Sequence, residues 1–308
     1  MEKREFKFLS KDMKTRIHAQ EWIPDQEVKA VLQICHGMVE YIDRYDEFAR
    51  FLASKGVYVV GHDHLGHGNS VTSKEEHGYF PEKNGNACVL GDIQTLRDMT
   101  KKKYPDVPYF MLGHSMGSFL LRQYLTVQGE GLSGAIIMGT GNQPMAILKA
   151  GQAVCRTIAK AKGWKHRSKL VDGMAFGSYN KKFEPAKTTK DWITSDEEHL
   201  MKYVNDPFCS YVFTVAGYYQ MFEGMKAIAT PAAAGLVPKN LPVYFVAGAE
   251  DPVGEFGKGV EKVWKQFKDA GIQDVQMKLY EGDRHEILNE TDRATVYEDL
   301  YTWIEERI

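Results

Sequence analysis

The sequence predicts an α/β fold built on a mostly parallel, doubly wound sheet that one helical insertion interrupts. Apolar, strand-like runs alternate with amphipathic helices in the first half of the chain, and the same alternation resumes after Pro231. Between them, residues 143–229 have helical periodicity and no convincing strand. We therefore expect a core in two parts, residues 1–141 and 231–308, with a helical cap over 142–230.

The first part of the core opens with residues 5–23, whose weak alternation predicts an antiparallel hairpin with its turn at Lys11-Asp12. Buried strands are expected where apolar residues run together, at 30–35, 57–60, 109–112 and 134–138. Amphipathic periodicity predicts helices at 45–56, at 89–104 and directly after residue 115.

In the cap, Ser195-Asp-Glu-Glu198 predicts a capping box that opens a helix at Ser195. The second part of the core begins with a strand at 243–247 and continues with a helix that Gly271 ends. A final strand is expected at 275–279 and a closing helix at 295–307.

Composition narrows the functional classes. The 308 residues carry a net charge of −2, so no global field recruits nucleic acid. The four cysteines are far apart without a C-x-x-C pair, which favours reduced thiols over a disulfide framework. No apolar signal region follows the charged N-terminus, and no run is long enough to span a membrane. We expect a cytoplasmic protein.

Gly113-His-Ser-Met-Gly117 lies between the predicted strand 109–112 and a predicted helix. Gly-x-Ser-x-Gly in this context is the nucleophile elbow of α/β-hydrolases. The sharp reversal strains the serine backbone, and the two glycines remove side chains that would clash. Ser115 then points into a cleft above a helix N-terminus, which favours a developing anion. Ser115 is the candidate nucleophile.

A serine hydroxyl needs a base to take its proton and an acid to orient that base. In this fold the chain order is serine, acid, histidine. His285 follows the last predicted strand and is the only histidine beyond His199. The strand at 243–247 is followed by Glu250-Asp251, of which we prefer Asp251 because Pro252 stiffens the following turn. Glu250 is the alternative acid. The non-catalytic interpretation is that the acid and the histidine are unrelated surface residues.

An oxyanion requires two preorganised backbone N–H donors. The residue after the nucleophile, Met116, is expected to supply one of them. The loop that starts His36-Gly37-Met38 is expected to supply the other, and we assign it to the amide of Met38. The Met38 side chain should then crowd the acyl pocket.

Five motifs together resemble the monoacylglycerol lipase and lysophospholipase-like branch (serine aminopeptidase S33 type) of the α/β-hydrolase superfamily. They are His36-Gly-Met-Val-Glu-Tyr-Ile-Asp-Arg-Tyr45, Asp63-His-Leu-Gly-His-Gly-Asn-Ser70, Gly113-His-Ser-Met-Gly117, Asp251-Pro-Val-Gly254 and Arg284-His-Glu-Ile-Leu-Asn-Glu290. The resemblance covers nearly the whole chain. It implies an α/β-hydrolase fold, cleavage of a small carboxylic ester such as a monoacylglycerol or lysophospholipid, and no cofactor. It also matches Ser115, Asp251 and His285 to the triad, and Met38 and Met116 to the oxyanion hole.

Three other functions stay open. His62, His64 and His67 are spaced like a zinc-hydrolase H-x-H-x-D-H run, but Gly66 stands where the aspartate should be, so a loop held by backbone hydrogen bonds is favoured and no metal is expected. An aminopeptidase or amidase of this fold would need an acid near the substrate amine, for which the cap offers Asp196, Glu197, Glu198 and Asp206. A non-enzymatic small-molecule receptor is disfavoured because it has no use for an activated serine.

The cap is expected to select the substrate. Its aromatic and Met-rich end predicts an apolar wall. The substrate-binding candidates there and beside the serine are Tyr211, Tyr218, Tyr219, Phe222, His36, Gly37 and His114. The two histidines more plausibly serve as structural hydrogen-bonding groups than as bases. Basic residues 160–169 favour a solvated helix face over a transient contact with a membrane or lipid surface.

Overall fold

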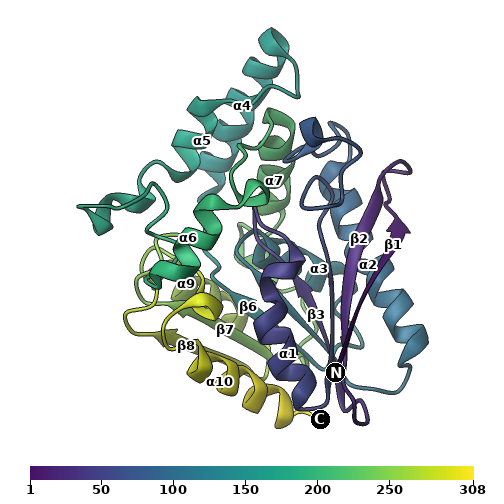
Figure 1. Ribbon diagram of the computed structural model, residues 1–308. Coiled ribbons are helices and arrows are strands. Elements are labelled where there is room, and N and C mark those ends of the chain that lie inside the picture. Colours follow the sequence, from purple (N-terminus) through teal and green to yellow (C-terminus); the bar gives the residue numbers. More distant parts are fainter.

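The computed structural model describes residues 1–308 and contains one eight-stranded sheet with the order β1-β2-β4-β3-β5-β6-β7-β8 (Figure 1). Its strands are β1 (Glu2–Leu9), β2 (Arg16–Ile23), β3 (Ala30–Cys35), β4 (Val57–His62), β5 (Tyr109–His114), β6 (Gly134–Met138), β7 (Val243–Gly248) and β8 (Val275–Tyr280). β2 pairs antiparallel with β1 and β4, and every other neighbouring pair is parallel. The predicted fold class and the N-terminal hairpin are confirmed.

Helices cover both faces of the sheet, so the central strands are buried on both sides and read as continuous apolar runs. One face packs on α1 (Asp46–Ser54) and α10 (Arg293–Glu305), and β5 contributes Phe110 and Leu112 to it. The other face packs on α2 (Gly85–Lys103), α3 (Met116–Gln128) and α9 (Lys258–Asp269), and Tyr109 and Met111 point that way. This alternation follows from the two-residue side-chain period of a strand.

Between β6 and β7 the chain forms no strand within the sheet. Residues 142–230, here named the inserted segment, hold α4 (Met145–Lys162), α5 (Lys169–Phe176), α6 (Glu197–Asn205) and α7 (Val215–Ala227), and α8 (Pro231–Ala234) follows. In Figure 1, α4 and α5 lie at the top of the view, above the sheet. None of the helices in the chain combines the length and the apolar composition that crossing a bilayer requires.

The predicted start of the helix at residue 89 is wrong, because α2 begins at Gly85. Its first turn carries little apolar signal. A tertiary contact supports it instead, since the amide of Asn86 donates to Gln220 Oε1 of α7 at 3.1 Å.

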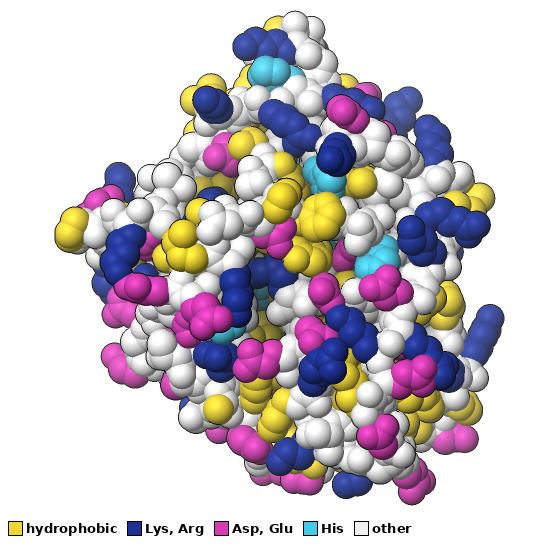
Figure 2. Space-filling view, in the orientation of Figure 1, with side chains coloured by type: hydrophobic (Ala, Val, Ile, Leu, Met, Phe, Trp, Pro, Cys, Tyr) yellow, Lys and Arg dark blue, Asp and Glu magenta, His cyan; other side chains and the backbone are white.

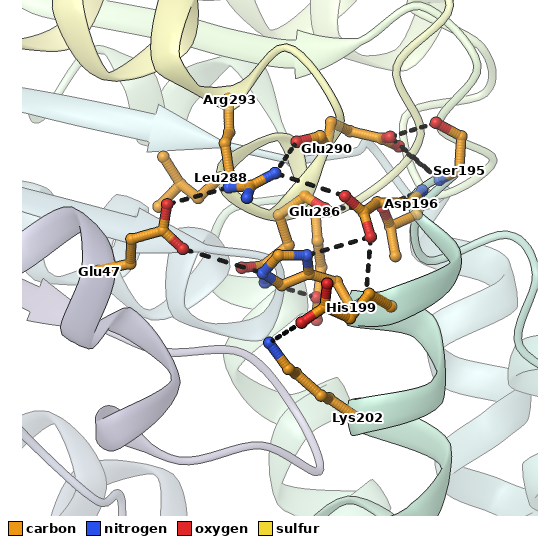
Figure 3. Close-up of polar contacts among 12 residues, drawn as sticks. Glu47, Ser195, Asp196, His199, Lys202, Glu286, Leu288, Glu290 and Arg293 are labelled. Atoms are coloured by element: carbon orange, nitrogen blue, oxygen red, sulfur yellow. Dashed lines mark hydrogen bonds and ion pairs between the residues drawn. The ribbon is translucent and has the colours of Figure 1, made fainter.

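The predicted helix cap at Ser195 is also displaced by one residue. The Asp196 side chain caps α6 by accepting from the amide of His199. Both the amide and the hydroxyl of Ser195 instead donate to Glu290, which lies 95 residues further along the chain. Figure 3 shows Ser195 and Asp196 turned toward the start of α10, where Arg293 contacts both Asp196 and Glu47. These contacts fasten α6 to the core.

Candidate active site

Ser115 lies at the turn between β5 and α3 with φ 53° and ψ −120°. A positive φ at a residue with a side chain is strained and persists only where the surroundings enforce it. A side chain at Gly113 would collide with the carbonyl of Gly117, and one at Gly117 with the carbonyl of Cys35 at the end of β3. The two glycines therefore let the helix start directly against the strands, which turns Ser115 outward at the carboxyl edge of the sheet.

His285 and Asp251 meet at this edge, although they come from different loops. His285 Nδ1 lies 2.9 Å from Asp251 Oδ2, and both side chains are buried. The other carboxylate oxygen, Asp251 Oδ1, accepts from the amide of Val253 at 2.8 Å, which fixes its orientation. The neighbouring acid, Glu250, is directed away and pairs with Lys182 at 2.6 Å. The geometry therefore favours Asp251 over Glu250 as the partner of the histidine.

The loop after β3 runs beside the serine. A Cβ on Gly37 would lie 3.0 Å from the Ser115 Cβ, so Gly37 permits this close approach. The amide of Met38 donates to no protein acceptor, and neither does the amide of Met116 at the first position of α3. Two N–H groups next to a serine that donate to no acceptor in the protein are free to donate to a developing oxyanion.

Glu40 joins the three loops that surround Ser115, and sequence analysis did not assign it a role. Its Oε1 accepts from the Gly37 amide and lies 3.0 Å from His114 Nδ1. Its Oε2 accepts from Arg44 at 2.9 Å, and Arg44 also makes a bidentate pair with Glu286. The glutamate and arginine of the His36–Tyr45 motif were the available signal.

The Glu40 carboxylate favours the protonated form of His114 in this network. Its Nδ1 faces the Glu40 carboxylate, and its Nε2 lies 3.2 Å from the carbonyl oxygen of His285, so both nitrogens face acceptors. Burial alone would lower the pKa of His114, but the hydrogen bond and charge of Glu40 outweigh it and raise the pKa. Burial would likewise raise the pKa of Glu40, but His114 and Arg44 hold it well below its usual range. His114 therefore serves to orient the loops that carry Glu40 and His285.

An apolar cavity of about 290 Å³ opens on one side of Ser115. The core contributes Met38, Met116, Phe119 and Val253, and the inserted segment contributes most of the remaining wall: Ile147, Leu148, Gly151, Val154, Val171, Met174, Ala175, Phe176, Tyr179, Met221, Phe222 and Met225. Such a wall suits an acyl chain or another elongated apolar group.

Ser115 also lines a second, smaller chamber of about 50 Å³, which His285 lines as well. It is more polar, since Lys190, Asp172 and Tyr211 all line it. The Lys190 ammonium lies 5.8 Å and 5.9 Å from the ring centroids of Phe176 and Trp192 and makes no hydrogen bond or ion pair. The Tyr211 hydroxyl is buried without a hydrogen-bond partner. Burial lowers the pKa of Lys190, although the charge of Asp172 counteracts it. The serine therefore lies between an apolar and a polar compartment.

The structure brings only some of the predicted binding residues to these compartments. Phe222 lines the apolar cavity, and His114 and Tyr211 line the polar chamber. Tyr218 and Tyr219 line neither, because Tyr218 is buried with its hydroxyl on Asp172 and Tyr219 packs on Trp164. Gly37 and His36 lie behind the serine, where His36 accepts from the amide of His64. The acids considered for an aminopeptidase line neither compartment: Asp196, Glu197, Glu198 and Asp206.

His62, His64 and His67 are buried side by side with His36. The rings of His36 and His64 are 4.3 Å apart, and those of His62 and His64 4.9 Å, the second pair edge-to-face. No group of three side chains in the chain is arranged to hold a metal ion. Burial lowers the pKa of His62 and of His67 to about 3 each. These histidines are neutral packing groups beneath the loop that carries Met38.

This burial predicts acid sensitivity. The unfolded chain binds a proton at His62 below about pH 6.5, whereas the folded chain does so only near pH 3, so stability falls as the pH drops through this window. The free energy of unfolding of the wild type should fall by about 1.4 kcal/mol per pH unit more steeply than that of His62→Leu between pH 6 and 4. Urea unfolding at each pH measures this, with His166→Leu as the control. Equal slopes for wild type and His62→Leu would contradict the neutral assignment.

Comparison with known proteins identifies the family to which the chain is similar. A family model described as serine aminopeptidase, S33, matches residues 26–292. A monoglyceride lipase homolog of Monkeypox virus is 27% identical over 302 residues, 95% of either chain. The monoacylglycerol lipase of Mycolicibacterium smegmatis is 26% identical over 92% of this chain and 90% of its own. A highly thermostable carboxyl esterase from Bacillus coagulans, solved in complex with glycerol, matches with a TM-score of 0.93 and 31% identity over 100% of this chain and 99% of that one.

Proposed function

Because the chain belongs to the serine aminopeptidase S33 family of α/β-hydrolases and is a carboxylic ester hydrolase, we propose that it cleaves single-chain acyl esters of the monoacylglycerol type through a triad of Ser115, His285 and Asp251. The observation that carries the proposal is the position of Ser115 between an apolar cavity and a polar chamber that His285 also lines. An amphiphilic ester fits this arrangement, because its acyl chain suits the apolar cavity and its polar alcohol suits the polar chamber.

In the proposed acylation, the Ser115 hydroxyl attacks the ester carbonyl while His285 takes its proton. Asp251 holds the imidazole by its Nδ1–H and stabilises the imidazolium that forms. The carbonyl oxygen becomes an oxyanion and receives hydrogen bonds from the amides of Met38 and Met116. When the intermediate collapses, the C–O bond to the alcohol breaks and His285 protonates the leaving oxygen. Water then repeats the sequence on the acyl-enzyme and releases the acid.

The side chains that line the polar chamber suit a leaving alcohol that carries free hydroxyl groups. Lys190 can donate and Asp172 can accept, so together they offer both partners to a diol without a net charge. The partly buried Lys190 ammonium makes no hydrogen bond within the protein, so it gains one when a hydroxyl arrives. The glycerol bound by the Bacillus coagulans esterase is a molecule of this kind. The inserted segment contributes Asp172, Lys190 and Tyr211 to the chamber, so we propose that it acts as a substrate-selecting cap.

Exposed apolar side chains at the rim of the apolar cavity support a contact with a lipid surface, which the basic residues alone did not favour. Ile147 and Met174 line the cavity and are nevertheless 59% and 58% exposed, and Leu170 of α5 is 63% exposed. Figure 2 shows Lys and Arg side chains gathered at the top of the molecule, where α4 and α5 lie. Apolar side chains beside cations suit an interface with anionic lipid.

The experiment compares 1-decanoylglycerol with propyl decanoate, which share the acyl chain and a three-carbon alcohol but differ in the free hydroxyls. We expect kcat/KM of the wild type to favour the glycerol ester by about tenfold, since a site built for hydroxyls discriminates against their absence. Lys190→Met should remove most of this preference. Lys187→Met, at an exposed lysine paired with Glu197, is the matched control and should preserve it. Equal rates on both esters in the wild type would contradict the assignment of the polar chamber.

A further inference from the structure

Arg122 of α3 is a buried arginine that no carboxylate neutralises. Its residue is 3% exposed, and its partners are three neutral oxygens. One terminal nitrogen donates to the carbonyl of Gly141 at 2.9 Å and to the hydroxyl of Thr140 at 3.2 Å. The other donates to the carbonyl of Ile228 at 3.3 Å. Burial lowers the pKa of Arg122 to about 9, which reflects the cost of a guanidinium without a counter-ion.

The three acceptors lie at the two crossings, which are the points where the chain leaves the core for the inserted segment and where it returns. Thr140 and Gly141 follow β6 and lead into α4, whereas Ile228 directly follows α7 and leads back to the core. A single guanidinium therefore holds both crossings against the helix that begins next to Ser115. Only a planar, multiply donating group reaches acceptors in these directions at once.

The two crossings set the position of the apolar cavity. α4 starts four residues after Gly141, and α7 ends one residue before Ile228, and these two helices pack on each other. They supply seven lining residues of the cavity, while Ser115 and Phe119 come from the nucleophile elbow and α3. A shift at either crossing moves one wall of the cavity relative to the serine.

The first crossing also contacts the loop of the proposed acid. A side chain on Gly141 would collide with the carbonyl oxygen of Val253. Val253 lines the cavity, and its amide donates to Asp251 Oδ1 at 2.8 Å. Thus Arg122 holds Gly141, and Gly141 packs on the loop that orients Asp251.

We propose that Arg122 is a positioning residue that aligns the acyl cavity of the inserted segment with Ser115 by tying both crossings to α3. The proposal rests on the proposed esterase function. It assigns acyl-chain selectivity to a side chain that lines neither compartment beside the serine.

Arg97 provides a matched control for the test. It is likewise buried, at 8% exposure, and it donates to the carbonyls of Gln128 and Glu130 at 2.7 Å each and to the Tyr124 hydroxyl at 3.0 Å. These acceptors lie at the far end of α3 and in the following loop, away from the inserted segment. Arg97→Gln therefore removes a comparable set of hydrogen bonds without touching a crossing.

The measurement is the ratio of kcat/KM for p-nitrophenyl decanoate to that for p-nitrophenyl acetate, with Tm recorded for each variant. Arg122→Gln should lower this ratio by about tenfold, mainly through KM for the decanoate, because a displaced wall affects the long chain and spares the acetyl group. Arg97→Gln should lower Tm similarly and change the ratio by less than about twofold. Arg122→Lys should retain part of the ratio, since the ammonium donates but lacks the fork.

A ratio that falls equally in Arg122→Gln and Arg97→Gln would overturn the proposal, because it would trace the effect to general loosening. An unchanged ratio in Arg122→Gln would overturn it too. If Arg122→Gln fails to fold, Thr140→Val removes a single acceptor of Arg122 and should shift the ratio in the same direction; no shift there contradicts the proposal. Failure of the esterase function itself looks different, since the wild type would then hydrolyse neither ester.

Discussion

Ser115→Ala should lower kcat for every ester by about 10⁴-fold or more, because the acyl-enzyme can no longer form. The protein should stay folded. The serine hydroxyl donates to no protein group in the structure, and alanine keeps the Cβ and the strained backbone of the elbow, so the free energy of unfolding should change by less than about 0.5 kcal/mol.

Two measurements check this together. Ester hydrolysis gives the loss of kcat, and a fluorophosphonate probe reports the activated serine directly, because it should label the wild type and not Ser115→Ala. Urea unfolding verifies the fold. Activity within about tenfold of wild type in the alanine variant would remove Ser115 from the mechanism. A wild type that neither reacts with the probe nor turns over would favour a binding protein.

Asp251→Asn should lower kcat by about 10⁴-fold with the geometry preserved. An asparagine in this place can present its NH₂ group to His285 Nδ1, which selects the tautomer that cannot accept the serine proton. The carboxylate also stabilises the imidazolium of the transition state, and the amide does not.

Glu250→Gln is the matched control, since it makes the same chemical change one residue earlier. Glu250 pairs with Lys182 and not with the histidine, and such a partly exposed pair contributes little, so kcat should stay within about twofold of wild type. The same p-nitrophenyl ester assay measures both variants. A large loss in Glu250→Gln with a small one in Asp251→Asn would move the acid to Glu250.

The parts of the fold that could be predicted from sequence have local causes. The central strands are buried on both faces, so they read as apolar runs, and Gly113 and Gly117 mark the turn because nothing larger fits there. The order of Ser115, Asp251 and His285 along the chain follows from the order of the strands. The approach of His285 to Asp251 could therefore be anticipated without coordinates, and the two side chains lie 2.9 Å apart. The assignment of the three residues as a triad stays a prediction.

What sequence could not provide depends on contacts between distant segments. The local sequence predicts Ser195 as a helix cap, but in the structure its amide and hydroxyl donate to Glu290 instead. Tyr218 and Phe222 lie on the same helix, yet only Phe222 lines the apolar cavity, because the packing of α7 and not its composition decides which face is turned inward. In the sequence Arg122 is an ordinary polar position of α3. Its significance emerges only from its acceptors in two other segments, at Thr140 and Gly141 and, 106 residues away, at Ile228.

The fastening of the inserted segment limits how freely it can be exchanged. The amide of Glu286 donates to the carbonyl of Ile193 at 2.8 Å, and the ring of Trp192 packs against His285. The segment thus builds part of the wall behind the histidine instead of resting on a finished core. A chimera that grafts the corresponding segment of a relative onto this chain would have to carry matching partners for Glu290, Arg293 and Arg122. Substrate range in this scaffold is therefore easier to diversify by changing side chains within the segment than by replacing it whole.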